Sequence, residues 1–485
     1  MGAKLPEAFT DKLRRMLGND YEAFLASYDD PRNYGLRVNT LKNRRLRLLA
    51  DFPFSAGAGS MGAAGFYYKE GERPGKHPFY HAGLYYIQEP SAMSPVELLD
   101  VKAGDRVLDL CAAPGGKSTQ IAAKLQGQGV LVSNDNHYVR TKALTKNIEL
   151  AGIRHAVVTN ETPDRLAGRF ERYFDKILID APCSGEGMFR KEEDMIKQWE
   201  PQAVERYTAM QRDILREAAR MLAPGGRIVY STCTFSPEEN ECMVGWFLQG
   251  HPSFRAAEVP LPGGASPGRP EWMEVGGCAD LPEAIADELT CTVRLWPHLV
   301  RGEGHFAAAL QHNGAGDDDV QRSKPDIATE QERLERCSQG ACKPRSGGTG
   351  TVRPTTGRGK DLSPVEEFLL THTKLAVKGT EAAHGEQVYL MPDGLPDLRG
   401  LKVVRPGWHL GVLRNGRFTP SHALAMGLRM EECARTVMLA STEPSAVSYL
   451  KGETLEIPEE RVVRDPGSCQ RLLPGRGGRL SGRLG

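Results

Sequence analysis

The chain has 485 residues, which exceeds one ordinary domain and predicts two or three globular units. Lysine plus arginine and aspartate plus glutamate each total 62, so the molecule as a whole has no net attraction to a polyanion, and nucleic acid could bind only through local patches. No stretch has the apolar length of a signal peptide or a membrane span, and ten cysteines in so long a chain favour reduced thiols over a disulfide framework. We therefore expect a cytoplasmic protein without membrane contact.

The first 90 residues are predicted to form a small α+β domain. Helical patterns alternate with turn signals from Leu5 to Asp51, and Tyr34 to Thr40 is typical of a short strand. At Gly104 the sequence changes to repeated units of apolar strand, glycine turn and helix, and we place this second domain at residues 91–311. Such a repeat indicates an α/β fold in which helices cover a parallel sheet.

Five strands are expected in the second domain, at residues 107–110, 130–133, 156–159, 176–180 and 227–232. The helix before the fifth strand has one apolar face, which is made by Ile214, Leu215, Ala218, Met221 and Leu222. Pro224-Gly225-Gly226 follows, and the sequence predicts that this tripeptide ends the helix.

The rest of the chain divides into three predicted parts. Residues 312–361 are rich in Gly, Ser, Thr, Pro, Lys and Arg, which is typical of a flexible linker. An amphipathic helix at residues 364–376 and short strands with glycine turns indicate a small mixed domain over residues 362–460. Residues 461–485 contain six arginines and one acidic residue among glycines, and we expect this tail to be disordered.

A ligand-binding loop is predicted between the first strand of the second domain and the helix that follows it. Glycines let the backbone approach a ligand, and the helix N-terminus presents free N–H groups with a partial positive charge. The loop consists of Cys111, Ala112, Ala113, Pro114, Gly115, Gly116 and Lys117. It lacks the G-x-G-x-x-G of dinucleotide folds. Asp135, after the second strand, is placed to bind ribose hydroxyls, and Asp180, at the tip of the fourth, opens onto the same edge of the sheet.

Two cysteines follow strand ends of the same sheet, so both thiols are expected to face the ligand crevice. Cys183 lies in the motif DAPCSG, and Cys233 lies in the motif STCT. A thiolate that adds to carbon 6 of a pyrimidine turns carbon 5 into a nucleophile for an electrophilic methyl group, while an acid stabilises the charge at the ring nitrogen. A base then removes the carbon 5 proton and the thiol leaves. The pocket could contain the nucleophile, the acid and the base of this reaction.

The other cysteines are given no chemical role. Cys337 and Cys342 lie five residues apart in the linker, but no second pair with zinc-ligand spacing accompanies them, and no metal is expected. A lone cysteine is most often a small buried hydrophobe. We apply this interpretation to Cys111, Cys242, Cys278, Cys291, Cys433 and Cys469.

With these motifs the sequence resembles the RNA 5-methylcytosine methyltransferase family, the group that includes the Fmu and Sun proteins. CAAPGGK, DAPCSG and STCT occur in this order at strand ends, and the resemblance extends from about Leu5 to Leu310. Arg294 to His298 and Gly302 to Phe306 also resemble the family's last catalytic-domain motif. The resemblance implies a Rossmann-like S-adenosylmethionine-dependent methyltransferase domain over residues 91–311, preceded by an RNA-recognition domain.

The resemblance also implies roles for single residues. Cys233 maps to the family's nucleophile, and Cys183 maps to the thiol that helps to release the methylated product. Asp180 maps to the residue that contacts the cytosine. The loop at residues 111–117, together with Asp135 and Asp180, maps to the S-adenosylmethionine site.

Some positions depart from the family's pattern or extend it. Thr162 occupies the family's third acidic cofactor position, so its hydroxyl or Asn160 would serve the adenine side instead. Lys117 and Arg37 are candidates for further site residues, and a solvated cation is the equal alternative for each.

The C-terminal region resembles the ribosomal branch of the family. Phe418 to Leu428 is similar to the start of its PUA-like RNA-binding domain, and we expect a PUA-like α+β domain over residues 362–460. After about Glu460 the family's aromatic and lysine-rich strands are replaced by the arginine-glycine segment, which indicates a chain that is truncated or read in another frame there.

Together these features predict an S-adenosylmethionine-dependent RNA cytosine-C5 methyltransferase. 16S ribosomal RNA is the leading substrate and transfer RNA the alternative. A non-catalytic RNA-binding ribosome assembly factor is the alternative from another class, and the pair Cys183 and Cys233 argues against it. DNA or small-molecule methylation would leave the N-terminal domain and the C-terminal extension unexplained. We expect a monomer without a metal, and the sequence leaves the methylated cytosine open.

Overall fold

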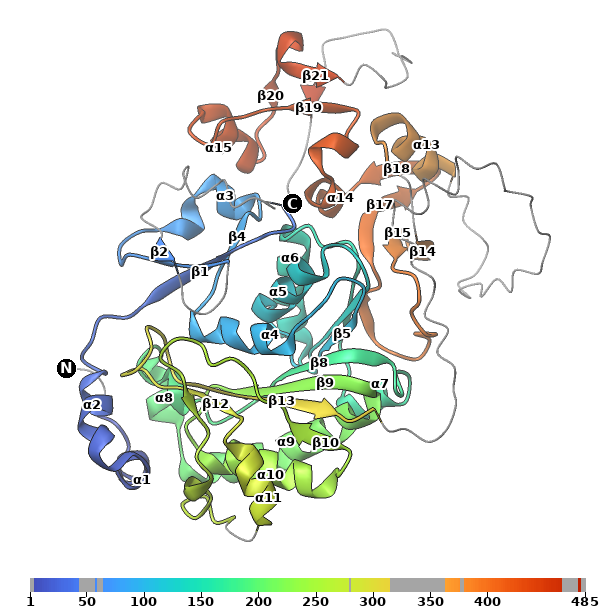
Figure 1. The fold of residues 1–485 in the computed structure, drawn as a ribbon. Helices are drawn as coiled ribbons and strands as arrows, with labels where there is room; N and C mark the ends of the chain where they lie inside the picture. The colour runs from blue at the N-terminus through green and yellow to red at the C-terminus, as the bar shows by residue number, and fades with distance from the viewer. Residues whose placement is uncertain are drawn as a thin grey trace, which may run out of the picture.

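The computed structural model describes residues 4–42, 64–278, 281–314, 363–375 and 379–464, and the backbone alone of residues 57–58 and 479–480. Its centre is a ten-stranded mixed sheet with the order β11-β12-β13-β9-β8-β5-β6-β7-β16, in which β10 also pairs with β13 (Figure 1). These strands are β5 (Arg106–Asp109), β6 (Val130–Asn134), β7 (Ala156–Thr159), β8 (Phe174–Asp180), β9 (Leu222–Thr232), β10 (Phe254–Ala256), β11 (Ser266–Pro267), β12 (Val293–Leu295), β13 (His305–His312) and β16 (Val403–Arg405).

The five central strands, β5 to β9, run parallel, as the sequence predicts. β5 pairs with both β6 and β8, while β7 extends the sheet on one side and β9 on the other. Their carboxyl ends therefore meet at one edge, which is where ligands bind in such sheets. The prediction of a Rossmann-like α/β domain is confirmed.

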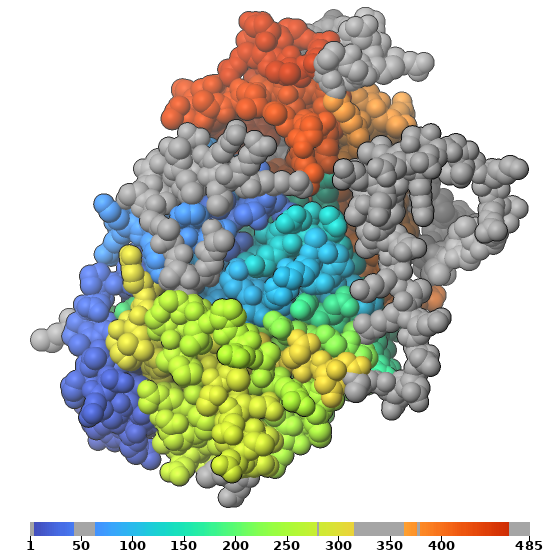
Figure 2. Space-filling view, in the orientation of Figure 1, coloured from blue at the N-terminus to red at the C-terminus, as the bar shows by residue number. Residues whose placement is uncertain are grey.

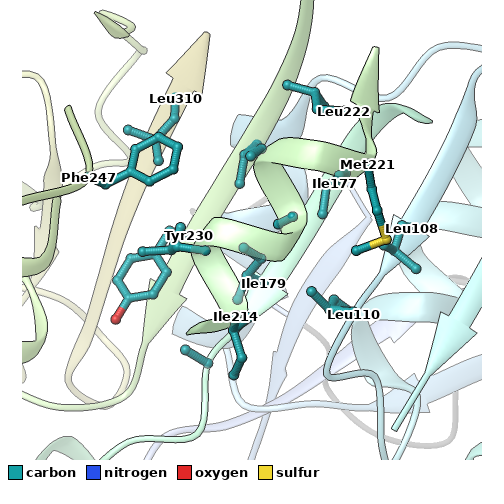
Figure 3. Close-up of a cluster of buried hydrophobic side chains, with 14 of the residues drawn as sticks. Leu108, Leu110, Ile177, Ile179, Ile214, Met221, Leu222, Tyr230, Phe247 and Leu310 are labelled. Carbon is teal, nitrogen blue, oxygen red and sulfur yellow. The ribbon is translucent and has the colours of Figure 1, made fainter. Parts of the chain in front are cut away.

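Apolar side chains alternate along these strands and give the sheet two buried faces. Leu108 points to the first face and its neighbour Val107 to the second. The first face is covered by α7 (Pro163–Ala167), α9 (Pro201–Met221), α10 (Glu241–Gly250) and α11 (Glu283–Leu289). The second face is covered by α4 (Ser94–Leu99), α5 (Gly116–Leu125) and α6 (Tyr138–Leu150). Figure 3 shows Ile214 and Met221 of α9 lying over the side chains of β5 and β8 on the first face.

Helix α9 ends earlier than predicted. Its last residue is Met221, and Leu222 already has extended backbone angles. Leu222 pairs with Phe174 on β8, so β9 begins there and includes Pro224-Gly225-Gly226. The prediction that this tripeptide ends the helix is wrong, because the chain already pairs with β8 at Leu222, before Pro224.

The N-terminal region is an α+β unit that lies against the central domain. Its elements are α1 (Glu7–Leu17), α2 (Tyr21–Ala26), β1 (Tyr34–Val38), β2 (Gly57–Ala58), β3 (Gly65–Tyr68), α3 (Pro78–His81) and β4 (Tyr85–Ile87). The strands form a sheet in the order β2-β3-β1-β4, and β1 is the strand that the sequence predicts at Tyr34 to Thr40.

Helices α1 and α2 pack through aromatic side chains on the central domain. The ring centroid of Phe24 lies 5.3 Å from that of Phe235, which stacks on Trp296 at 4.7 Å. The buried Arg190 bonds Glu303 at 3.0 Å and donates to the carbonyl of Ser27, just after α2. In the space-filling view the dark-blue N-terminal residues lie directly on the yellow-green surface (Figure 2).

The C-terminal region contributes a mixed unit and one strand of the central sheet. Its elements are α13 (Ser363–His372), β14 (Thr380–His384), β15 (Gln387–Met391), β17 (Trp408–Arg414), β18 (Arg417–Pro420), α14 (His422–Gly427), β19 (Arg435–Val437), α15 (Pro444–Leu450), β20 (Leu455–Glu456), β21 (Val462–Arg464) and β22 (Arg479–Leu480). Four of the strands form an antiparallel sheet in the order β14-β15-β17-β18. Apart from residues 312–314, the predicted linker lies outside the described residues, as do most of the predicted disordered tail residues.

Strand β16 joins this unit to the methyltransferase sheet. It pairs antiparallel with β7, and the buried Arg405 donates to the carbonyls of Ala156 and Ile153. At the other end of the chain, Val462–Arg464 pairs with β19, so the predicted disorder is wrong for these residues. Their pairing partners lie outside the segment itself, and its composition does not reveal them.

One disulfide corrects the expectation of reduced cysteines. Cys242, on α10, is bonded to Cys278, and their Cα atoms lie 5.9 Å apart, within the usual range for a disulfide. The two positions are 36 residues apart and meet because the segment after β11 folds back over α10. Among the described residues, no helix combines the length and the apolar character that a membrane crossing needs.

Breaking the buried ion pair of Arg294 and Glu241 is predicted to lower the stability of the protein. Arg294 is 1% exposed, bonds Glu241 at 2.8 Å and donates to the carbonyl of Phe235. Arg294→Leu would leave a buried carboxylate without its partner, so the free energy of unfolding should fall by about 3–5 kcal/mol in urea denaturation. Arg216→Leu, which breaks the exposed pair with Asp213, is the control and should cost about 0.5 kcal/mol or less. Equal losses for both variants would contradict this account.

Candidate active site

Two sulfur atoms lie together at the carboxyl edge of the sheet. β8 and β9 are parallel neighbours in which Asp180 pairs with Ser231, so the segments after both strands emerge side by side. The Sγ atoms of Cys183 and Cys233 are 3.4 Å apart, and both residues are partly buried. The structure therefore brings together the two thiols that the sequence singles out.

Hydrogen bonds hold the two cysteine segments against each other. The hydroxyls of Ser184 and Thr234 are 2.7 Å apart, and the N–H of Gly187 donates to the carbonyl of Cys233 at 2.9 Å. A Cβ atom on Gly187 would lie 2.6 Å from the carbonyl oxygen of Gly304, so only glycine allows this close approach. The positions of both thiols are thus set by backbone and side-chain contacts on each side.

Asp180 lies beside the thiols and is paired with Lys117. One carboxylate oxygen accepts from the Lys117 ammonium at 2.7 Å, and the other accepts from the Ser231 hydroxyl at 3.1 Å. Burial acts to raise the pKa of Asp180, but Lys117 and its other donors outweigh burial and lower it. The side chain is still 33% exposed, so an ionised carboxylate can meet a ligand here. Of the two interpretations of Lys117, the structure supports the site residue over the solvated cation.

Cys183 differs from its neighbour in its surroundings. The contact with Cys233 and burial raise the pKa of the Cys183 thiol well above its usual value, and Glu239 raises it further. Glu239 accepts from the N–H of Ser184 at 3.1 Å and from Gln211 at 2.8 Å, and burial raises its own pKa to about 8. These surroundings therefore favour the protonated form of the Cys183 thiol. Sequence reasoning missed Glu239, whose only signal was its position five residues after the STCT motif.

His305 is a second residue that the sequence did not single out. Its ring is 4% exposed, and Nε2 lies 3.8 Å from the Asp180 oxygen that faces Ser231. It is the first residue of β13, which pairs antiparallel with β9 so that Phe306 lies opposite Thr232. The motif Gly302 to Phe306 was recognised, but only the pairing of β13 with β9 shows that the histidine reaches the site.

The predicted ligand-binding loop turns between β5 and α5. Gly115 has φ +110° and precedes the first residue of α5, a conformation that other residues rarely adopt. Asp135 accepts from the N–H groups of Ala113 at 3.3 Å and His137 at 2.9 Å, so its carboxylate lies at the loop. The loop and Asp135 are therefore brought together, as the sequence predicts.

Asp109, a buried carboxylate at the end of β5, indicates which groups a ligand of this loop should have. Oδ2 of Asp109 accepts from Ser118 at 2.6 Å, while Oδ1 has no hydrogen-bond partner among the described residues. Burial raises the pKa of Asp109 to about 7. A ligand with an ammonium group and ribose hydroxyls would complement this carboxylate and Asp135, and S-adenosylmethionine has both.

Two other candidate residues, Thr162 and Arg37, lie near a strand end of the same sheet and at the loop, respectively. Thr162 is exposed just before α7, while the buried residue of that turn is Glu161, which accepts from the N–H of Lys402 at 2.6 Å. Arg37 is buried, so the interpretation as a solvated cation is wrong. It donates to the carbonyl of Gly116 at 2.9 Å and to the hydroxyl of Thr119 at 2.7 Å, and so supports the start of α5 from the N-terminal domain.

A Rossmann-like domain with a glycine loop, a strand-end carboxylate and a paired thiol defines the class of methyltransferases, and the comparisons specify it further. Residues 96–311 match the model of the 16S rRNA methyltransferase RsmB/F, and residues 5–90 match that of the N-terminal domain of 16S rRNA methyltransferase RsmF. Residues 367–428 match the first C-terminal domain of the RsmF rRNA methyltransferase. All three matches are to models of the RsmB/F or RsmF type, which confirms the resemblance seen in the sequence.

Individual relatives agree with this family. The chain is 34% identical over 321 residues to ribosomal RNA small subunit methyltransferase F of Escherichia coli, with 64% of each chain covered. It is 35% identical over 317 residues to the protein of the same name from Serratia proteamaculans, with 63% of each covered. The solved structure of a methyltransferase homologue from Pyrococcus horikoshii is 28% identical with a TM-score of 0.51, and the match covers 64% of this chain and all of that one. The matches thus span just under two thirds of the length of the curated relatives.

The position of Asp135 at the loop predicts that its removal weakens cofactor binding. Asp135→Ala removes a carboxylate at the loop, and each charged hydrogen bond to a ribose hydroxyl contributes about 1.5–3 kcal/mol. S-adenosylmethionine should therefore bind roughly tenfold more weakly, or worse, in isothermal titration calorimetry. Asp213→Ala, which removes an exposed carboxylate on α9, is the control and should leave the affinity unchanged. Unchanged affinity in Asp135→Ala would place the ribose site elsewhere.

Proposed function

We propose that this protein transfers a methyl group from S-adenosylmethionine to carbon 5 of a cytosine in 16S ribosomal RNA. The observation that carries the proposal is the pair of sulfur atoms, 3.4 Å apart, beside the Lys117–Asp180 ion pair at the carboxyl edge of the sheet. The names of the relatives and the match to two RsmF domains support ribosomal RNA as the substrate. Transfer RNA is the second candidate, and the intact thiol pair argues against a non-catalytic assembly factor. We expect the protein to be a cytoplasmic monomer that needs no metal.

The first step in this proposal is an attack by a thiolate. Cys233 forms a bond with carbon 6 of the cytosine, and the ring electrons move toward carbon 5 and the ring nitrogen. Cys183, whose sulfur lies 3.4 Å from that of Cys233, is assigned to the release step by the resemblance to the family. Asp180, which Lys117 keeps ionised, can accept a hydrogen bond from the 4-amino group and orient the ring.

Methyl transfer and release complete the reaction. S-adenosylmethionine, when held by the loop at residues 111–117 and Asp135, supplies the electrophilic methyl group that carbon 5 attacks. A base then removes the proton from carbon 5, the bond between Cys233 and carbon 6 breaks, and the double bond between carbons 5 and 6 returns. Cys183 lies at the leaving sulfur, where its proton can pass to the departing thiolate.

Substitutions of the two cysteines test the proposed division of roles. Cys233→Ala should abolish methyl transfer while S-adenosylmethionine still binds, because the thiolate acts only in the chemical step. In Cys183→Ala the Cys233 thiolate should still attack carbon 6, but the methylated RNA should be released slowly. A covalent protein–RNA adduct should therefore survive denaturing gel electrophoresis. The double variant should form no adduct.

The control and the contrary outcomes are equally specific. Cys291→Ala, which removes a thiol that precedes β12, two strands away from β9, should behave as wild type. An adduct in Cys233→Ala but not in Cys183→Ala would reverse the two roles. If neither wild type nor any variant forms an adduct, even with RNA that contains 5-fluorocytosine, covalent catalysis is wrong. Bisulfite sequencing of 16S and transfer RNA from a deletion strain distinguishes the two substrates.

A further inference from the structure

His305 is a buried polar group that the proposed reaction does not yet use. The residue is 4% exposed, and neither ring nitrogen has a partner of hydrogen-bonding geometry among the described residues. Its Nε2 faces Oδ1 of Asp180 at 3.8 Å. Leaving a buried polar group without a hydrogen bond is unfavourable, so the position of His305 beside a functional carboxylate calls for an explanation.

Burial is the main influence on the charge of the His305 ring and favours its neutral form. Burial and the nearby Lys117 lower the pKa of His305 to about 4, and Asp180 only partly opposes them. Neutral imidazole carries one N–H donor and one acceptor nitrogen. The histidine therefore offers an uncharged donor that does not change its protonation state across the physiological pH range.

The site needs such a donor. When a thiolate adds to carbon 6 of cytosine, negative charge spreads over the ring nitrogen and the carbonyl oxygen at carbon 2. Asp180 cannot stabilise that charge, because Lys117 and Ser231 donate to its two oxygens and keep it ionised. Lys117 approaches the carboxylate at Oδ2, whereas His305 lies at Oδ1, so the two cationic or donating groups occupy different sides of Asp180.

We propose that His305 contacts the target base and donates an N–H hydrogen bond to the carbonyl oxygen at carbon 2 of the pyrimidine, while Asp180 accepts from the 4-amino group. This assignment rests on the proposed function and adds a residue that binds the cytosine and stabilises the charge that develops on it. The pairing of β13, whose first residue is His305, with β9 holds the histidine at this edge of the sheet. A donor aimed at developing charge acts mainly on the chemical step.

Two variants of similar shape test the hydrogen bond. His305→Met fills the space without a donor, and His305→Gln keeps an N–H at a similar distance. With 16S rRNA transcribed in vitro and labelled S-adenosylmethionine, kcat should fall about 100-fold for His305→Met and less than about tenfold for His305→Gln. S-adenosylmethionine affinity should be unchanged in both. His155→Met is the control, because that buried histidine directly precedes β7, at the opposite edge of the sheet from the thiols.

A measurement on the wild-type protein keeps the test independent of folding. RNA transcribed with 2-thiocytidine replaces the carbonyl oxygen by sulfur, a poorer acceptor, and the rate of adduct formation should fall about tenfold. That penalty should disappear in any folded His305→Met protein. Equal rates for the methionine and glutamine variants would contradict the proposal, as would a wild-type enzyme that treats both RNAs alike. Failure of wild type to produce 5-methylcytosine in bisulfite sequencing would instead contradict the proposed function.

Discussion

The parallel pairing of β8 with β9 is the constraint on which the site depends. Asp180 lies opposite Ser231, so the two loops that leave these strands start at the same edge and at the same height. Residues that are 50 positions apart in the sequence thereby come within 3.4 Å, without either loop having to find the other by its own contacts. The apolar faces of both strands, buried under α9 on one side and α4 on the other, keep this register from slipping. The geometry of the thiols is thus a property of the sheet.

Buried polar networks surround this edge and connect it to the other parts of the chain. Arg190 joins Glu303 to the end of α2, Arg294 joins Glu241 to the carbonyl of Phe235, and Arg37 joins β1 to the start of α5. Burying charges is costly unless each has its partners, so such pairs contribute more to a specific arrangement than to net stability. In this protein they fix the N-terminal domain and the loop after Cys233 at defined positions around the pocket.

The C-terminal region is part of the same framework on the cofactor side. Its strand β16 pairs with β7 and covers what would otherwise be an open sheet edge. Glu161, at the turn where the family has its third cofactor position, bonds the N–H of Lys402, and Arg154 bonds Glu432 and the carbonyl of Gly427. Residues beyond 400 therefore hold the turn next to the proposed adenine side, although the sequence suggested a separate unit on a flexible linker.

The sequence by itself determined the α/β class and the five parallel strands, because these depend on local periodicity. It also determined the identity of the strand-end residues, because these lie in short motifs that can be recognised in the sequence. It also indicated Cys183, Cys233, Asp180, Lys117 and the loop at residues 111–117. Only the tertiary structure decided the end of α9, the bond between Cys242 and Cys278, the burial of Arg37 and the exposure of Thr162. Each of these depends on a partner distant in sequence, as does the position of His305 beside Asp180, and a local pattern carries no information about such a partner.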